Sequence, residues 1–172
     1  MTLYLLRHGI AEDKALGKPD RDRRLTAQGR ARMRRAAAGL RVLVEPLDAI
    51  YTSPYPRAAE TAAIVVAALG KAPKPRSLEA LAHQTSPMEA LRVLRSIIKG
   101  DHVMLVGHEP ELSQLASLLL TGSIDGMRLV LKKGGCLAIT IRTLAPRVAV
   151  LEWLATPRAL RRLGRAATHP SS

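Results

Sequence analysis

The sequence predicts an α/β fold, a three-layer sandwich in which helices cover both faces of a mostly parallel central sheet. Short apolar runs at residues 2–6, 49–53 and 102–106 are typical of buried parallel strands. Helix-forming segments separate these runs, and strands that alternate with helices form parallel sheets. The 172 residues, 47% of them hydrophobic, are enough for one core, so we expect a single domain over residues 1–172.

The elements follow from breaks and capping residues along the chain. After the first strand at 2–6, the polar residues 10–25 predict a long loop, and Thr26 is a suitable N-cap for a helix that reaches about Leu40. The further expected elements are a strand over 49–53, a helix over 55–69, a short strand over 76–78, a helix from Ser86 to before Gly100, a strand over 102–106, a helix over 111–120, and strands over 136–141 and 148–154.

The end of the chain is expected to be a basic tail from about residue 157. It contains one short helix in our prediction and frays from Ala166. The last two strands, 136–141 and 148–154, are expected at the edge of the sheet.

The formal charge of +13 implies attraction to anions such as phosphate groups, acidic proteins, nucleic acid or a membrane surface. Much of it lies in two arginine clusters, which also fit a solvated helix face: Arg30, Arg32, Arg34 and Arg35, then Arg158, Arg161, Arg162 and Arg165. Aromatic residues make up only 2% and no nucleic-acid-binding motif is present, which argues against nucleic acid as the partner.

The compartment follows from cysteine usage and from apolar run lengths. Cys136 is the single cysteine, so no intrachain disulfide can form and a reducing compartment is expected. We interpret it as a small core residue. The apolar run at residues 2–6 is too short for a signal peptide, and no run approaches 18 residues. We therefore expect a cytoplasmic protein with no membrane partner.

Basic residues follow three of the predicted strands. The first strand ends in Arg7-His8-Gly9, the second leads through Ser53-Pro54 to Arg57, and the third ends in Gly107-His108. The carboxyl ends of parallel strands meet at one edge of a sheet, where ligands bind in open α/β folds. Two histidines and two arginines could therefore converge there, with Gly9 allowing a sharp turn of the backbone. Arginine suits phosphate, and neutral imidazole is a usable nucleophile.

These motifs resemble the histidine phosphatase superfamily, with its phosphoglycerate-mutase-like fold. The residues that carry the resemblance are Arg7-His8-Gly9, the segment from Ser53 to Ala62, and Gly107-His108. The short chain and the segment Asp20-Arg21-Asp22-Arg23-Arg24-Leu25-Thr26-Ala27-Gln28-Gly29 are most similar to the SixA-type phosphohistidine phosphatases, which have a D-x-x-R-x-L-T-x-x-G pattern there. The resemblance covers about residues 2–110.

The resemblance implies a role for each matched residue. His8 would be the nucleophile that becomes a transient phosphohistidine, and His108 would donate to the phosphate from the far side. Arg7, Arg57 and Arg23 would bind the phosphoryl oxygens, and Gly9 and Asp20 are further candidates for substrate binding. No metal and no other cofactor is expected in this family. Nearby cations would also disfavour protonation of His8 and keep it nucleophilic.

The general acid is less clear. Many relatives use a glutamate after the second helix, where Glu79 is the candidate, and Asp20 is a second candidate because the SixA-type pattern is acidic there. Both also fit solvated carboxylates. A phosphoramidate needs less acid help because its nitrogen can be protonated before the bond breaks. The other histidines, His83, His102 and His169, are expected to be structural or exposed.

We therefore predict a metal-independent phosphatase that works through a His8 phosphoenzyme on phosphohistidine in a protein, such as a phosphorelay domain. The first alternative is a phosphatase for small phosphate esters or polyphosphate, which the charge of +13 would suit. The second is a non-catalytic module that binds phosphate or phosphoproteins. Two other classes lack their motifs, since no metal-hydrolase spacing and no P-loop occurs.

Overall fold

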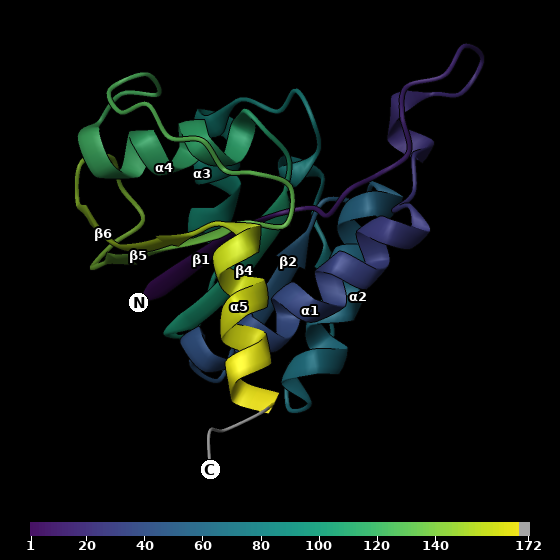
Figure 1. The fold of residues 1–172 in the computed structure, drawn as a ribbon. Helices are drawn as coiled ribbons and strands as arrows, with labels where there is room; N and C mark the ends of the chain where they lie inside the picture. Colours follow the sequence, from purple (N-terminus) through teal and green to yellow (C-terminus); the bar gives the residue numbers. More distant parts are fainter. Residues whose placement is uncertain (169–172) are drawn as a thin grey trace.

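The computed structural model describes residues 1–168 and confirms the α/β fold, so His169 lies outside the described residues. One six-stranded sheet has the order β3-β2-β4-β1-β5-β6 (Figure 1). The strands are β1 (Thr2–Arg7), β2 (Ala49–Thr52), β3 (Arg76–Ser77), β4 (His102–Gly107), β5 (Cys136–Ile141) and β6 (Ala149–Ala155). The first four are parallel, whereas β5 is antiparallel to β1 and β6 is antiparallel to β5. This leaves β6 at the edge that we predicted.

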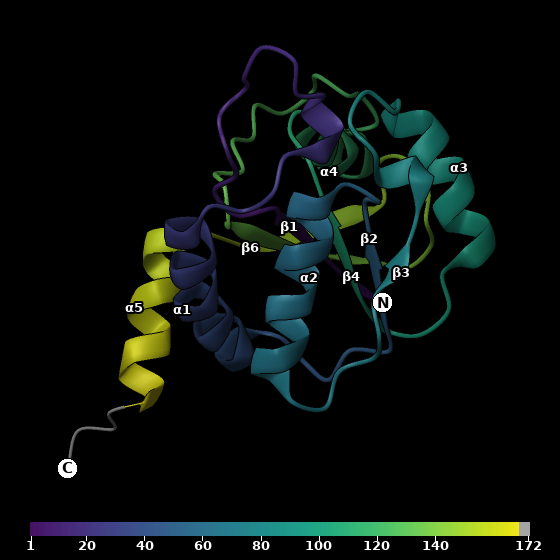
Figure 2. The same ribbon diagram turned by 90° about the vertical axis from the view of Figure 1, so that its right-hand side faces the viewer.

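Helices cover both faces of this sheet. Those on one face are α1 (Ala27–Leu43), α2 (Pro56–Leu69) and α5 (Pro157–Thr168), and those on the other are α3 (Pro87–Ile97) and α4 (Glu111–Thr121) (Figures 1 and 2). Two short 3₁₀ helices, η1 (Asp20–Asp22) and η2 (Glu79–Leu81), lie in the loops. No helix of residues 1–168 combines the length and the hydropathy that crossing a bilayer requires.

The alternation of side chains along β1 builds the two halves of the core. Leu3 and Leu5 pack among the leucines of α3 and α4, while Tyr4 and Leu6 face the opposite way, toward α1 and α2. All four of these side chains are buried. The two apolar layers confirm the three-layer sandwich.

α1 begins where the sequence predicted, because the Thr26 hydroxyl accepts a hydrogen bond from Gly29 N at 2.9 Å. It ends three residues later than expected, at Leu43, whose side chain packs against the core cluster beneath the helix. A Cβ on Gly29 would lie 1.9 Å from Ile10 O, so only glycine lets the loop after β1 approach α1 this closely.

The predicted fraying from Ala166 is wrong, because α5 continues through Thr168 and packs along α1. Two glycines allow this close contact. A Cβ on Gly39 would lie 1.9 Å from Leu160 O, and one on Gly164 would lie 2.7 Å from Arg35 O. Packing against α1 at Leu160 and Gly164 stabilises α5, so the helix does not depend on propensity alone.

We expect Gly39→Ala to destabilise the protein by about 1–3 kcal/mol, because the new methyl group meets the backbone of α5 and forces the helices apart. The gain in helix propensity, about 1 kcal/mol, is smaller than this cost. Urea unfolding measures the difference. Gln28→Ala, at an exposed position of the same helix, is the matched control and should change stability little. A Gly39→Ala variant as stable as the wild type would contradict the close packing.

Candidate active site

The carboxyl ends of β1, β2 and β4 lie side by side, as the sequence predicted. Arg7 is in register with Gly107, and Thr52 is in register with Val106. The pairing extends one residue further, since His8 N donates to Gly107 O at 3.1 Å and Ser53 N donates to Val106 O at 2.9 Å. The rings of His8 and His108 consequently lie close together, with 5.1 Å between their centroids.

His8 is held with one ring nitrogen protonated and the other available. Its Nδ1 lies 2.7 Å from Gly9 O, and because a carbonyl oxygen only accepts, Nδ1 carries the proton. The lone pair of the neutral ring is therefore on Nε2. Burial, with the positive charges of Arg57 and Arg7, lowers the pKa of His8 to about 3. The imidazole is thus neutral and nucleophilic at physiological pH.

His108 is fixed through its other nitrogen. Nε2 lies 2.7 Å from Ser53 Oγ, which also accepts a hydrogen bond from Tyr55 N at 3.2 Å. The Nδ1 atom is buried and has no hydrogen-bond partner among residues 1–168. Burial, His8 and Arg57 together lower the pKa of His108 to about 2, so this ring is neutral as well. A buried, unpartnered nitrogen beside the nucleophile is a polar group that a ligand can satisfy.

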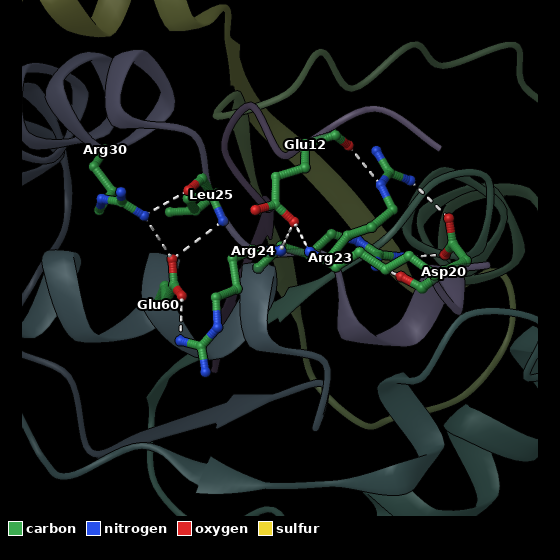
Figure 3. Close-up of polar contacts among 9 residues, drawn as sticks. Glu12, Asp20, Arg23, Arg24, Leu25, Arg30 and Glu60 are labelled. Atoms are coloured by element: carbon green, nitrogen blue, oxygen red, sulfur yellow. Dashed lines mark hydrogen bonds and ion pairs between the residues drawn. The ribbon is translucent and has the colours of Figure 1, made fainter. Parts of the chain in front are cut away.

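Two arginines meet on one carboxylate in front of these rings. Arg57, which is 3% exposed, donates through Nη1 to Asp20 O at 2.5 Å and through Nη2 to Asp20 Oδ2 at 2.8 Å. Arg23 donates to the other carboxylate oxygen, Oδ1, at 2.6 Å (Figure 3). Burial raises the pKa of Asp20, but Arg23 and Arg57 outweigh it and hold the pKa at about 2. Asp20 is therefore an anion that occupies the arginine forks.

A second layer of contacts holds the loop after β1 in place. Arg23 Nε also donates to Glu12 O at 2.5 Å, while Glu60 on α2 binds Arg24, Arg30 and Leu25 N (Figure 3). The loop that supplies Asp20 and Arg23 is therefore joined to α1 and α2 by several polar contacts.

Arg7, the last residue of β1, also lies at the site. Its Nη1 donates to Leu131 O at 2.9 Å, which fixes the guanidinium, and its buried Nε has no partner among residues 1–168. Burial lowers the pKa of Arg7, against the opposing charges of Glu109 and Glu111. One oxygen of Glu109 accepts from Ser113 Oγ at 2.6 Å, and the other is buried without a partner in the described chain.

These residues enclose a cavity of about 240 Å³. Its lining is strongly cationic: it comprises Arg7, His8, Lys14, Asp20, Arg23, Arg57, His83, His108, Glu109 and Lys133. Five of the ten are lysine or arginine and two are acidic. Such a cavity, with planar arginine forks and a neutral imidazole, suits a phosphoryl group.

The structure assigns Gly9 a different contact from the one expected. Its N–H donates to Thr61 Oγ1 at 3.0 Å, and Thr61 in turn donates to Arg57 O at 2.7 Å. The Gly9 amide is thus already paired within the protein. The backbone of Gly9 does not have a positive φ, so a left-handed turn is not what requires glycine here. Its small size matters instead for packing against Leu25.

Of the two acid candidates, only Asp20 lies in the cavity. Glu79 begins η2, is exposed and is not among the lining residues. A third carboxyl that the sequence did not single out as an acid, Glu109, lines the cavity instead. Burial raises the pKa of Glu109 despite the opposing effects of Ser113 and Arg7. Among the carboxyl groups of the lining, Glu109 is the one whose protonated form is favoured.

Three further lining residues were outside the predicted site: Lys14 from the loop after β1, His83 and Lys133. His83, expected to be structural or exposed, lines the cavity with its ring centroid 5.9 Å from that of His108, and its Nδ1 lies 2.8 Å from Glu111 Oε1. Lys133 arrives from the loop before β5. Lys133 could have been predicted from the Lys132-Lys133-Gly134 sequence before a strand. His83, which follows η2, lies in no local motif that would predict its position.

Among residues 1–168, no three His, Cys, Asp or Glu side chains lie together in a way that could hold a metal ion. The buried Cys136 packs in the core below the sheet, away from this cavity, and burial raises the pKa of its thiol. The cationic side chains of the lining are Arg7, Lys14, Arg23, Arg57 and Lys133.

Sequence comparison gives two matches. A family model described as the histidine phosphatase superfamily (branch 1) matches residues 3–85. An uncharacterized protein from Picosynechococcus sp. is 38% identical over 142 residues, which cover 81% of this chain and 84% of that protein.

Solved structures share the fold. The protein histidine phosphatase SixA complexed with tungstate has a TM-score of 0.78 at 21% identity, over 93% of this chain and 99% of that chain. A putative SixA from Agrobacterium tumefaciens has a TM-score of 0.73 at 22% identity, over 91% and 97%. A phosphoserine phosphatase from Entamoeba histolytica in complex with 3-phosphoglyceric acid has a TM-score of 0.69 at 18% identity, over 92% and 98%.

Proposed function

The chain belongs to the histidine phosphatase superfamily and is accordingly a phosphatase, and from this premise we propose that its substrate is phosphohistidine in a protein. The observation that carries the proposal is the state of the two rings. His8 is neutral with its lone pair on Nε2, and it lies 5.1 Å from His108 inside a cavity lined by arginines. A bound phosphoryl group would face a nucleophile and several cationic donors at once.

In the proposed reaction, the Nε2 lone pair of His8 attacks phosphorus while the bond from phosphorus to the substrate imidazole nitrogen breaks. Arg7, Arg23 and Arg57 stabilise the oxygens in transfer, and the unpartnered Nδ1 side of His108 faces the same group. The other ring nitrogen of the substrate takes a proton from solvent before the bond breaks, so the substrate histidine leaves as a neutral imidazole. Water then attacks the phosphohistidine on His8, one of its protons passes to a carboxylate, and free phosphate and neutral His8 remain.

Asp20 must release its hydrogen bonds with Arg23 and Arg57 when a phosphoryl group binds. Its carboxylate now fills the positions on Arg23 and Arg57 where phosphoryl oxygens would bind. We propose that the substrate displaces this carboxylate, which is why we assign Arg23 and Arg57, and not Asp20, to substrate binding. An anion with a pKa near 2 cannot serve as a proton donor at neutral pH.

The test compares two peptides of one sequence, one carrying phosphohistidine and one carrying phosphoserine, together with p-nitrophenyl phosphate. We expect the phosphohistidine peptide to have the highest kcat/KM, and each rate to be the same with and without EDTA. Since the fold is shared with a phosphoserine phosphatase, an ester substrate is the alternative. Faster turnover of the phosphoserine peptide would favour that alternative, and binding of phosphate without turnover of any substrate would favour a non-catalytic module.

For Glu109 we expect a leaving-group effect. Its raised pKa keeps it protonated to a higher pH than an ordinary glutamate, so acid catalysis by Glu109 is present below this pKa and lost as the pH rises through it. Glu109→Gln should lower kcat/KM for the phosphoserine peptide about 10²-fold and flatten the alkaline fall of its pH profile. In the phosphohistidine peptide, the ring nitrogen that is not bonded to phosphorus can be protonated by solvent. Turnover of this peptide should therefore fall less than about tenfold.

Glu79→Gln is the matched control, because this exposed glutamate lies outside the cavity lining. It should leave both pH profiles unchanged. An equal loss on both peptides in Glu109→Gln would show that Glu109 acts on Arg7 and not as a proton donor.

A further inference from the structure

The packed helices α1 and α5 present a dense cationic surface. We call it the arginine face and define it by Arg32 and Arg35 of α1 with Arg158, Arg161 and Arg165 of α5. The two helices lie side by side in both views (Figures 1 and 2), and neither contains an acidic residue. Burial and then the charges of Arg32, Arg165, Arg35 and Arg158 lower the pKa of Arg161, so the guanidinium groups are close enough to repel one another.

This face differs from the other arginine clusters in its pairing. Arg24 and Arg30 are neutralised by Glu60, Arg23 and Arg57 by Asp20, and Arg92 by Glu89. By contrast, Arg32, Arg35 and Arg161 have no ion-pair partner among residues 1–168. The like charge concentrated at Arg32, Arg35 and Arg161 costs stability, and an external anion relieves that cost.

The arginine face is continuous with the candidate active site through shared residues. Lys133 lines the catalytic cavity and also a second hollow of about 130 Å³, to which Arg32 and Arg161 contribute. Arg161 in turn lines a third hollow of about 520 Å³ together with Arg35 and Arg165. A cationic track therefore runs from the nucleophile over Lys133 to the seam between α1 and α5.

We propose that the arginine face docks an acidic protein surface that adjoins the phosphorylated residue of the substrate. This inference rests on the proposed function, since it describes how a phosphoprotein would be held. Arginine forks match carboxylates, and the face spans two helices, as a protein surface requires. The hollows contain no aromatic side chain on which bases could stack, which disfavours a single-stranded nucleic acid.

The test uses two phosphohistidine peptides. One has a run of aspartate and glutamate on one side of the phosphohistidine, and the other has serine and asparagine instead. We expect the wild type to prefer the acidic peptide by about 10- to 100-fold in kcat/KM at 50 mM NaCl, and to lose most of this preference at 300 mM NaCl. Arg32→Glu/Arg161→Glu should abolish the preference while leaving turnover of p-nitrophenyl phosphate unchanged.

The matched control is Arg76→Glu/Arg95→Glu, which makes the same change of charge on β3 and α3, away from α1 and α5 (Figure 2). It should keep the preference. Thermal unfolding establishes that both double variants fold, and Arg32→Gln/Arg161→Gln gives a milder version of the change. Equal kcat/KM for the two peptides in the wild type, or equal loss in both double variants, would overturn the proposal.

Direct binding separates this proposal from the proposed function. Fluorescence anisotropy with the unphosphorylated acidic peptide should show binding that Arg32→Glu/Arg161→Glu weakens at least about tenfold, whether or not phosphohistidine is the substrate. If long-chain polyphosphate, and not the acidic peptide, depends on Arg32 and Arg161, the protein assignment is wrong and the face serves a linear polyanion.

Discussion

His8→Ala should abolish turnover and the trapped phosphoenzyme together, with kcat falling on the order of 10⁴-fold or more, because the reaction loses its covalent route. The ring lines the cavity, and its only hydrogen bond within residues 1–168 is to Gly9 O, so removal should leave the fold intact. The measurement is incubation with a radiolabelled phosphodonor, quenching in alkali, which preserves phosphohistidine, and mapping of the label by peptide.

His102→Asn is the matched control, because this histidine begins β4 at the other end of the strand and is not part of the cavity lining. It should retain both activity and label. Label on any residue other than His8, or turnover that survives in His8→Ala, would contradict the assignment of the nucleophile. Loss of label in His102→Asn would mean that the loss reflects the fold and not the chemistry.

Much of the fold was predictable because local sequence and global packing agree. The apolar run at residues 3–6 is buried on both faces, which only a strand with helices on each side allows. Thr26 and Ser86 each accept from the amide three residues ahead and begin their helices as expected. The length of α5 was predicted wrongly, because this helix packs on α1, with Leu160 against Gly39, and such a contact between distant segments leaves no local pattern.

Part of the candidate site could also be predicted from the sequence, and part could not. The sequence could predict that three residues lie close together: His8, Ser53 and His108. Each follows a strand of the parallel sheet, and the register of parallel strands places their carboxyl ends side by side. The bridge from Asp20 to Arg23 and Arg57 could not be predicted, because it depends on the path of a loop and not on a repeating backbone geometry. The same holds for Lys133 and for His83, which arrive from loops with no periodic pattern.

The Asp20 bridge also neutralises a buried charge. Arg57 is almost fully buried, and a buried cation without a partner is costly. Asp20 supplies the partner, and its depressed pKa means that this ion-pairing contributes stability above the usual aspartate range, which is lost as the pH falls toward about 2. Arg57 is therefore held in place by an internal anion.

Arg57→Ala should lower kcat/KM about 10³-fold, because it removes a buried fork that would bind the phosphoryl oxygens in the transition state. Arg57→Lys should recover only a small part of this loss, since a point charge cannot replace two parallel donors.

Asp20→Asn tests the exchange of anions, because it keeps Arg57 and removes the competing charge. Inhibition by inorganic phosphate should become weaker in Arg57→Ala and tighter in Asp20→Asn. If inhibition by phosphate is weaker in both variants, Asp20 positions the arginines and does not compete with the substrate for them.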